Sequence, residues 1–229
     1  MRFDIITIFP EIINAYLSES IIKRACERGL LDVHVHNLRN FTDDKHRTVD
    51  DKPYGGGPGM VLKIEPIVRA VNHVKHLVSD NLSDTKCLTL ITSADGIPFD
   101  AKQAGQFSKK YGRIILIAGH YEGIDARLEK ILRVTSYELR VTPLSIGPFV
   151  LTGGELPALV VLDAVSRHIP GVLGKEESLE ERRYGVGVPV YTRPEVFEYN
   201  GKKYKIPGVL KSGDHKRIEE WRRKHKTEF

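Results

Sequence analysis

Apolar residues recur along the chain with two different spacings, which predict strands and helices in turn. Short runs rich in Ile, Val and Leu are typical of strands, and apolar residues three or four positions apart are typical of amphipathic helices. The predicted strands span residues 2–9, 31–38, 87–92, 113–118 and 136–141, and the predicted helices span residues 10–29, 65–78, 100–110 and 126–132. Strands separated by helices favour an α/β fold, a doubly wound parallel sheet.

The later part of the chain has different patterns. Residues 156–165 form a helical stretch that is apolar on nearly every side, with Asp163 as the exception. Such a helix must be buried in a large core or against another subunit. Residues 171–200 have little periodicity and indicate a linker, and residues 212–224 predict a basic helix.

The positive charge is concentrated at one end of the sequence. The formal net charge is +5, and residues 201–229 alone contain ten Lys/Arg against four acids. This asymmetry favours a polyanionic partner, although a solvated basic tail would give the same composition.

Neither cysteine chemistry nor a targeting segment is indicated. Cys26 and Cys87 belong to no CxxC or Cys/His metal spacing, and we expect them to be small buried residues. The first residues do not resemble a signal peptide, and no apolar run approaches the roughly 20 residues of a membrane helix. The sequence therefore predicts a soluble, cytoplasmic protein without membrane association.

Glycine-containing loops follow three of the predicted strands. They are residues 93–96, 119–123, and the pair 145–147 and 151–154. Ligands of open parallel sheets bind beyond the carboxyl ends of the strands, and glycine lets the backbone approach a ligand closely. The three loops together predict one backbone-lined pocket, and tight strand-to-helix turns are the alternative for each loop alone.

A long polar loop at residues 41–58 leads into a further glycine-rich segment, residues 54–60. A loop of this length is commonly functional. The segment lacks the Gly-Lys-Ser/Thr ending of a phosphate loop, and Met60 stands where a dinucleotide fingerprint needs its third glycine. Neither motif therefore assigns a nucleotide phosphate as the ligand.

Six segments resemble the tRNA (guanine-N1)-methyltransferases of the knotted SPOUT superfamily. In chain order they are PYGGGPGMVL (53–62), GHYEGIDAR (119–127), SIGPFVLTGGELP (145–157), DAVSRHIPGVLG (163–174), YTRP (191–194) and SGDHKRIEEWR (212–222). The resemblance covers nearly the whole chain. It implies methyl transfer from S-adenosylmethionine to N1 of guanosine(37), on the 3′ side of the tRNA anticodon.

The resemblance also implies a domain organisation. Residues 1–168 would form a catalytic domain with a deep trefoil knot that binds S-adenosylmethionine. Residues 169–200 would be a linker, and residues 201–229 a small, mainly helical, basic domain that holds tRNA. The enzyme would be a homodimer with its active sites at the subunit interface, in agreement with the apolar helix at 156–165.

The cofactor residues implied by the resemblance lie in the three loops. They are Thr92, Ser93, Ala94, Gly96, Gly119, Tyr121, Glu122, Gly123, Ser145, Ile146, Gly147, Phe149, Val150, Leu151, Gly153, Gly154 and Pro157. We expect His120 to shape the pocket through its backbone and packing. Pro148 and Phe149 replace an Asp-Tyr pair that is usual in the family, so this part of the site is expected to differ.

Methylation of N1 requires a base, because N1 of neutral guanine carries a proton, and a cation near O6, where negative charge develops. By the family pattern Arg167 is the cation, with a structural ion pair as the alternative. The usual Asp-Ser-Phe is missing after Ser178. Allowing one deletion, the base falls on Glu181, with Glu180 as the second candidate; both could instead be solvated acids of a charge run.

The remaining expectations concern substrate, metal and rival functions. The substrate residues implied are Asp50, Tyr54, Gly59, Ser178 and Asp214, and Asp214 could also cap the C-terminal helix. The family implies magnesium, but the sequence supplies no evident ligand cluster. A knotted methyltransferase for a ribose 2′-hydroxyl and a non-catalytic tRNA-binding descendant are the competing interpretations.

Overall fold

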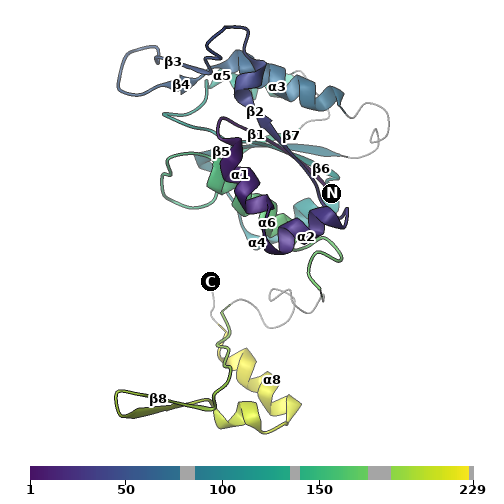
Figure 1. Cartoon of the computed structure of the whole chain (residues 1–229), viewed down its shortest axis with the longest axis vertical. Coiled ribbons are helices and arrows are strands. Elements are labelled where there is room, and N and C mark those ends of the chain that lie inside the picture. Colours follow the sequence, from purple (N-terminus) through teal and green to yellow (C-terminus); the bar gives the residue numbers. More distant parts are fainter. Residues whose placement is uncertain (78–85, 135–139, 175–186, 227–229) are drawn as a thin grey trace. The chain divides into compact units, whose positions relative to one another are not determined.

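The computed structural model describes residues 1–77, 86–134, 140–174 and 187–226. Within them the chain divides into two compact units, Met1–Leu173 and Gly174–Phe229. The first unit is built on five parallel strands in the order β2-β1-β6-β5-β7. Their bounds are β1 Arg2–Thr7, β2 Asp32–Asn37, β5 Cys87–Pro98, β6 Arg113–Ile117 and β7 Arg140–Ser145. The predicted α/β fold with a parallel sheet is confirmed (Figure 1).

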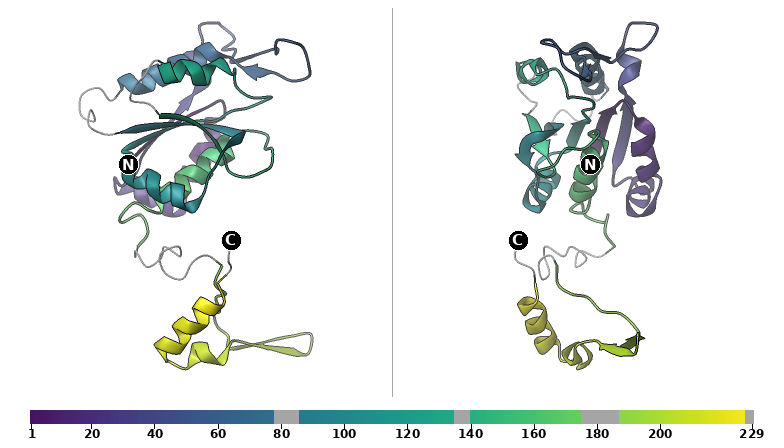
Figure 2. Two further views of the ribbon diagram at one scale, coloured as in Figure 1. Left: turned by 180° about the vertical axis from the view of Figure 1, so that it is seen from behind. Right: turned by 90° about the vertical axis from the view of Figure 1, so that its left-hand side faces the viewer.

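Helices cover both faces of the sheet, as both views in Figure 2 show. The helices of the first unit are α1 Pro10–Leu17, α2 Ser20–Glu27, α3 Ile64–His76, α4 Ala101–Lys110, α5 Arg127–Val134 and α6 Glu155–Ser166. One hydrophobic core joins α1, α2, α4 and α6 to Phe3, Leu90 and Leu116 of the sheet. A second core joins α3 and α5 to the opposite face. Because both faces are covered, the central strands are nearly continuous apolar runs.

The order of the strands places the carboxyl ends of β6, β5 and β7 side by side. Strand β7 follows β6 in the chain but pairs with β5, on the far side of β5 from β6. Helix α5, before β7, packs on one face of the sheet, and α6, after β7, packs on the other face. Helix α6 is buried along most of its length, as its apolar sequence predicted. Its Asp163 accepts a hydrogen bond of 2.6 Å from the Tyr16 hydroxyl of α1.

Several element boundaries differ from the sequence prediction. The single helix predicted at 10–29 is two helices, α1 and α2, and Ser20, the first residue of α2, has φ +53°. The strand predicted at 136–141 is β7, Arg140–Ser145. Proline usually ends a strand, but β7 lies at the edge of the sheet, where Pro143 can pair without donating a ladder hydrogen bond.

The smaller elements complete the description. A 3-10 turn η1 (Leu38–Phe41) and a short antiparallel pair, β3 (Asp50–Asp51) and β4 (Val61–Leu62), belong to the first unit. The second unit contains an antiparallel hairpin, β8 (Val196–Tyr199) and β9 (Lys202–Lys205), a 3-10 turn η3 (Gly208–Lys211) and helix α8 (His215–Lys224).

The second unit also differs in part from the sequence prediction. Strand β8 lies within residues 171–200, which the pattern suggested as a linker, and the hairpin adds strands to a domain expected to be mainly helical. The predicted cap of α8 is confirmed, since the Asp214 carboxylate accepts hydrogen bonds from the backbone of Lys216 and Arg217. Among the described residues, no helix is long and apolar enough to cross a membrane.

Candidate active site

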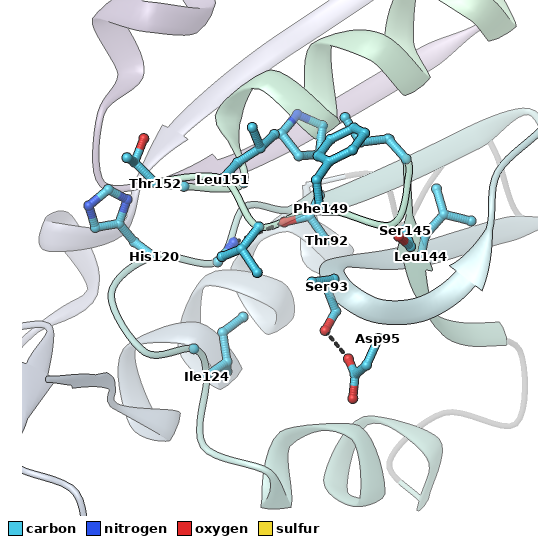
Figure 3. A pocket seen from close by; sticks show the side chains of 18 of the residues that line it. Thr92, Ser93, Asp95, His120, Ile124, Leu144, Ser145, Phe149, Leu151 and Thr152 are labelled. Carbon is cyan, nitrogen blue, oxygen red and sulfur yellow. Dashed lines mark hydrogen bonds between the residues drawn. The ribbon is translucent and has the colours of Figure 1, made fainter. Parts of the chain in front are cut away.

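The loops at the carboxyl ends of β5, β6 and β7 converge on one pocket of about 490 Å³. Figure 3 shows Thr92, His120 and Ser145, one from each loop, around it. Every predicted cofactor residue except Gly96 lines this pocket. Its volume falls in the range typical of small-molecule sites, about 300–1,000 Å³. The pocket predicted from glycine-containing loops is therefore present in the structure.

Backbone hydrogen bonds tie the three loops together. The Gly154 N–H donates to the Gly119 carbonyl at 2.7 Å. The Gly119 N–H in turn donates to Thr92 Oγ1 at 3.1 Å, and Thr92 Oγ1 lies 3.2 Å from the Ile117 carbonyl oxygen, to which it donates. These hydrogen bonds connect the loops that follow β5, β6 and β7.

This close approach leaves no room for side chains. A Cβ on Gly154 would lie 2.0 Å from Thr92 Oγ1 and 2.6 Å from the Gly119 nitrogen. A Cβ on Gly153 would lie 2.4 Å from Glu155 Oε2. Glycine is required at Gly154, where a Cβ would meet backbone atoms, whereas at Gly153 the side chains of Glu155 and His120 would have to shift. Neither glycine has a positive φ.

Gly96 has a different role from the one expected. Strand β5 does not end at Thr92 but continues to Pro98, with a register shift between Thr92 and Ile97. A Cβ on Gly96 would lie 2.5 Å from the backbone nitrogen of Leu144 in β7. Gly96 therefore allows the irregular part of β5 to approach β7, and it is not among the residues that line the pocket.

The pocket also contains side chains that the sequence reasoning missed. They are Asp95, Ile124, Leu144 and Thr152, whereas His120, which was expected to shape the pocket, is also among its lining residues. Ser93 donates a hydrogen bond to the Asp95 carboxylate, which brings a negative charge to the rim (Figure 3). The position of Asp95 in a glycine-containing loop directly after a buried strand was the available signal for it.

A buried carboxylate lies directly behind the pocket. Glu155, in the first turn of α6, is 3% exposed, and its Oε1 accepts a hydrogen bond of 2.6 Å from Thr7 Oγ1 at the end of β1. Its Oε2 lies 3.8 Å from Nδ1 of His120. A helix N-terminus favours a negative charge. Glu155 thus links β1, α6 and the pocket residue His120.

The glycine-rich segment before β4 meets the same pocket. The Glu122 N–H donates to the Met60 carbonyl at 3.0 Å, and the Leu62 N–H donates to the Gly123 carbonyl at 3.0 Å. A Cβ on Gly59 would lie 2.4 Å from Glu122 Oε1. Of the predicted substrate residues, Gly59 is therefore brought to the cofactor loops.

Asp50 and Tyr54 belong to the same segment but do not line the pocket. Asp50 pairs with Leu62 in the β3-β4 ladder, and the Tyr54 side chain is fully exposed. Asp214 caps α8 in the second unit.

Of the predicted catalytic residues, Arg167 is described by the structure and does not line the pocket of its own chain. Arg167 follows the last turn of α6, whereas the pocket residue Pro157 is in its first turn. The 12 residues of α6 correspond to a length of about 18 Å. Glu180, Glu181 and Ser178 lie outside the described residues. Among the described residues, no group of three or more His, Cys, Asp or Glu could hold a metal ion.

Comparison with known proteins gives similarity over both units. Residues 1–228 match the family described as tRNA (Guanine-1)-methyltransferase TrmD. A tRNA (guanine-N(1)-)-methyltransferase of Clostridioides difficile (strain 630) is 47% identical over 97% of this chain and 91% of its own length. Proteins of the same name from Dictyoglomus turgidum and Thermomicrobium roseum are 46% and 47% identical over 98% and 97% of this chain, and 84% and 78% of their own lengths.

Proposed function

Because the chain belongs to the tRNA (guanine-1)-methyltransferase family, we propose that it transfers a methyl group from S-adenosylmethionine to N1 of guanosine(37) in tRNA. The observation that carries this proposal is the convergence of three glycine-containing loops on one pocket. A cytoplasmic location accords with a tRNA substrate.

The pocket suits S-adenosylmethionine in size and chemistry. When bound, this cofactor supplies the methyl group as a sulfonium. Backbone N–H and C=O groups of the loops at Gly119, Ser145 and Gly153 would hold the adenine and ribose, and the Asp95 carboxylate at the rim would favour a cationic ligand. The described residues give no support for Mg²⁺, and no step is assigned to a metal.

The chemistry on the guanine requires two side chains of this protein. A carboxylate, Glu181 or its neighbour Glu180, would take the proton from N1, and Arg167 would stabilise the negative charge that develops at O6. Asp50, Tyr54, Gly59 and Ser178 would position the extruded nucleoside, which must leave the base stack before its N1 edge is accessible.

A homodimer accounts for the distance between Arg167 and its own chain's pocket. Helix α6 exposes Leu156 (56%) and Val160 (44%), and α1 exposes Ile12. An exposed apolar surface of this kind is typical of a subunit interface. Pairing through α6 would let one protomer supply Arg167 to the pocket of its partner. The deep trefoil knot is part of this proposal, as is the assignment of residues 1–168 to cofactor binding and 201–229 to tRNA binding, joined by residues 169–200, which include β8.

A methyl-transfer assay on an anticodon stem-loop tests the proposal. We expect wild-type protein to produce N1-methylguanosine from RNA with G at the target site and no product from RNA with A. Arg167→Ala and one of Glu180→Gln or Glu181→Gln should lower kcat by about 100-fold or more. Loss of activity in Arg167→Ala but in neither glutamine variant would reject the assigned base.

Two other results would reject the function itself. A 2′-O-methyl nucleoside as product would assign the protein to ribose methylation. Absence of S-adenosylmethionine binding in isothermal titration, with tRNA binding intact, would favour the non-catalytic tRNA-binding protein.

A further inference from the structure

The β8-β9 hairpin carries exposed aromatic rings on one face. Phe197 pairs with Tyr204 across the hairpin, and Tyr199 pairs with Lys202. Side chains of a strand alternate between its faces, so these four residues share one face. The three aromatic residues are 56%, 55% and 60% exposed, for Phe197, Tyr204 and Tyr199 respectively. We refer to Phe197, Tyr199 and Tyr204 as the aromatic face.

The geometry of the hairpin orients these rings. The rings of Phe197 and Tyr199 are nearly parallel, with an interplanar angle of 11° and centroids 6.4 Å apart. Asn200 and Gly201 connect the strands with φ of +50° and +72°, the signs that a two-residue type I′ turn requires at both positions. Such a turn fixes the strand register, and it thereby keeps all three rings on the same face. Figure 2 shows the hairpin projecting away from α8 within this unit.

Positive charge surrounds the aromatic face. Lys202 shares that face, while Lys203 on the opposite face forms an ion pair of 2.9 Å with Glu198. The hairpin contains three lysines, Lys202, Lys203 and Lys205, against the single acid Glu198. Exposed rings beside excess cations fit a partner that has both apolar planar surfaces and negative charges.

Unpaired nucleotides have both properties. Their bases expose flat faces that stack on aromatic side chains, and their phosphates attract lysine. A base-paired stem keeps its base faces inside the helix, and a typical protein surface lacks the regular negative charge. A membrane surface would present phosphates but no ring faces for stacking.

We propose that the aromatic face is a stacking platform for unpaired bases of the RNA substrate, with Lys202 beside a phosphate. This inference rests on the proposed function, because it assumes an RNA substrate with a single-stranded loop. It assigns to the second unit a direct contact with bases, in addition to the phosphate contacts that its basic charge provides.

Binding of a fluorescent anticodon stem-loop tests the platform. The probe carries 2-aminopurine in the loop, whose emission falls when the base stacks on a ring. Tyr199→Val and Phe197→Val remove a ring but keep an apolar residue that favours strands. We expect each variant to bind about tenfold more weakly, equivalent to about 1.4 kcal/mol, with less quenching. Tyr199→Phe retains a ring and should bind like the wild type.

The salt dependence of RNA binding and a control with duplex RNA distinguish the contribution of base stacking from that of charge. Lys202→Ala should reduce the slope of log K against log[salt] by about one, whereas Tyr199→Val should leave that slope unchanged. Affinity for a fully paired RNA of equal length should not change in Tyr199→Val. Each variant should still bind S-adenosylmethionine, which shows that the first unit is intact.

Two results would overturn the platform. Equal affinity of wild type, Tyr199→Val and Phe197→Val for the loop RNA would show that the rings do not stack on RNA bases and would favour a protein partner for the aromatic face. Equal loss of affinity for loop and duplex RNA in Tyr199→Val would show a general defect of the second unit. In either case methyl transfer by the wild type would keep the proposed function, whereas wild-type protein that binds no RNA would reject both.

Discussion

The two units of the chain present opposite kinds of surface. In Met1–Leu173, side chains are buried in two cores and the pocket is lined mainly by residues of three loops. In Gly174–Phe229, none of the described residues is buried, and aromatic and basic side chains are exposed. A small cofactor of constant shape suits a preformed backbone pocket. An RNA is larger and bears regular negative charge, and exposed cations and rings suit it better.

The two units should therefore differ in what stabilises them. The first unit contains a buried ionic cluster, in which Asp4 is fully buried and accepts hydrogen bonds from Arg2 at 2.9 Å and Arg113 at 2.8 Å. His36 lies 2.9 Å from the same carboxylate. Burial alone would raise the pKa of Asp4, but the hydrogen bonds from His36 and Arg2 and the charge of Arg113 outweigh it and hold the pKa well below its usual range.

The largest predicted effect is the loss of this carboxylate. Asp4→Asn leaves buried cations without their partner and should lower the free energy of unfolding of the first unit by about 3–5 kcal/mol at pH 7. Because the folded pKa lies below the unfolded value, Asp4 contributes stability above about pH 4, and the contribution is lost as the pH falls through the folded pKa. The difference in free energy of unfolding between wild type and Asp4→Asn should thus become smaller in acid. Urea denaturation followed by circular dichroism measures this free energy at pH 7 and at acid pH.

A control and an internal probe sharpen this test. Asp32→Asn removes an exposed carboxylate that lies 3.6 Å from Arg2 and should change stability by less than about 1 kcal/mol. Trp221, the only tryptophan of the sequence, lies in the second unit. If the two units fold independently, its fluorescence transition should not move in Asp4→Asn. A joint shift of both transitions would contradict the contrast between the units.

The next predicted effect concerns the pocket. Gly154→Ala forces a Cβ to within 2.0 Å of Thr92 Oγ1, and such overpacking costs about 1–3 kcal/mol. We expect affinity for S-adenosylmethionine to fall by about tenfold to a hundredfold, measured by isothermal titration. Gly174→Ala is the matched control, because a Cβ there meets nothing within 4 Å. Unchanged affinity in Gly154→Ala would mean that the loop contacts do not shape the cofactor site.

The sequence was sufficient to predict the pocket because its residues are local to strand ends. In a parallel sheet all carboxyl ends lie at one edge, so loops that begin at residues 93, 119 and 145 must meet there. Glu155 could not be found in this way. Its partner Thr7 is 148 positions away, and their contact depends on α6 packing beside β1, which no local pattern encodes.

The predicted boundaries of helices and strands were wrong where tertiary structure overrides local preference. Apolar residues continue at helical spacing through residues 10–25, so the pattern gave no sign that the backbone leaves the helix before Ser20, whose φ is +53°. The strand predicted to end at residue 141 continues through Pro143, because the edge position of β7 tolerates a proline. The aromatic face was also missed, because the sequence pattern gave no pairing partner for residues 196–199.

The smallest predicted effect decides between two roles of Asp214. Its carboxylate caps α8 by accepting hydrogen bonds from the Lys216 and Arg217 N–H groups at 3.1 Å. Asn caps equally well, whereas Asp214→Ala should destabilise the second unit by about 0.5–2 kcal/mol. Fluorescence of Trp221 on the same helix measures this loss.

If capping is the role, Asp214→Asn should bind RNA as the wild type does, and Asp214→Ala should bind more weakly only to the extent that α8 unfolds. Equal loss of RNA affinity in both variants, with the Trp221 transition of Asp214→Asn unmoved, would instead make the charged carboxylate a substrate contact.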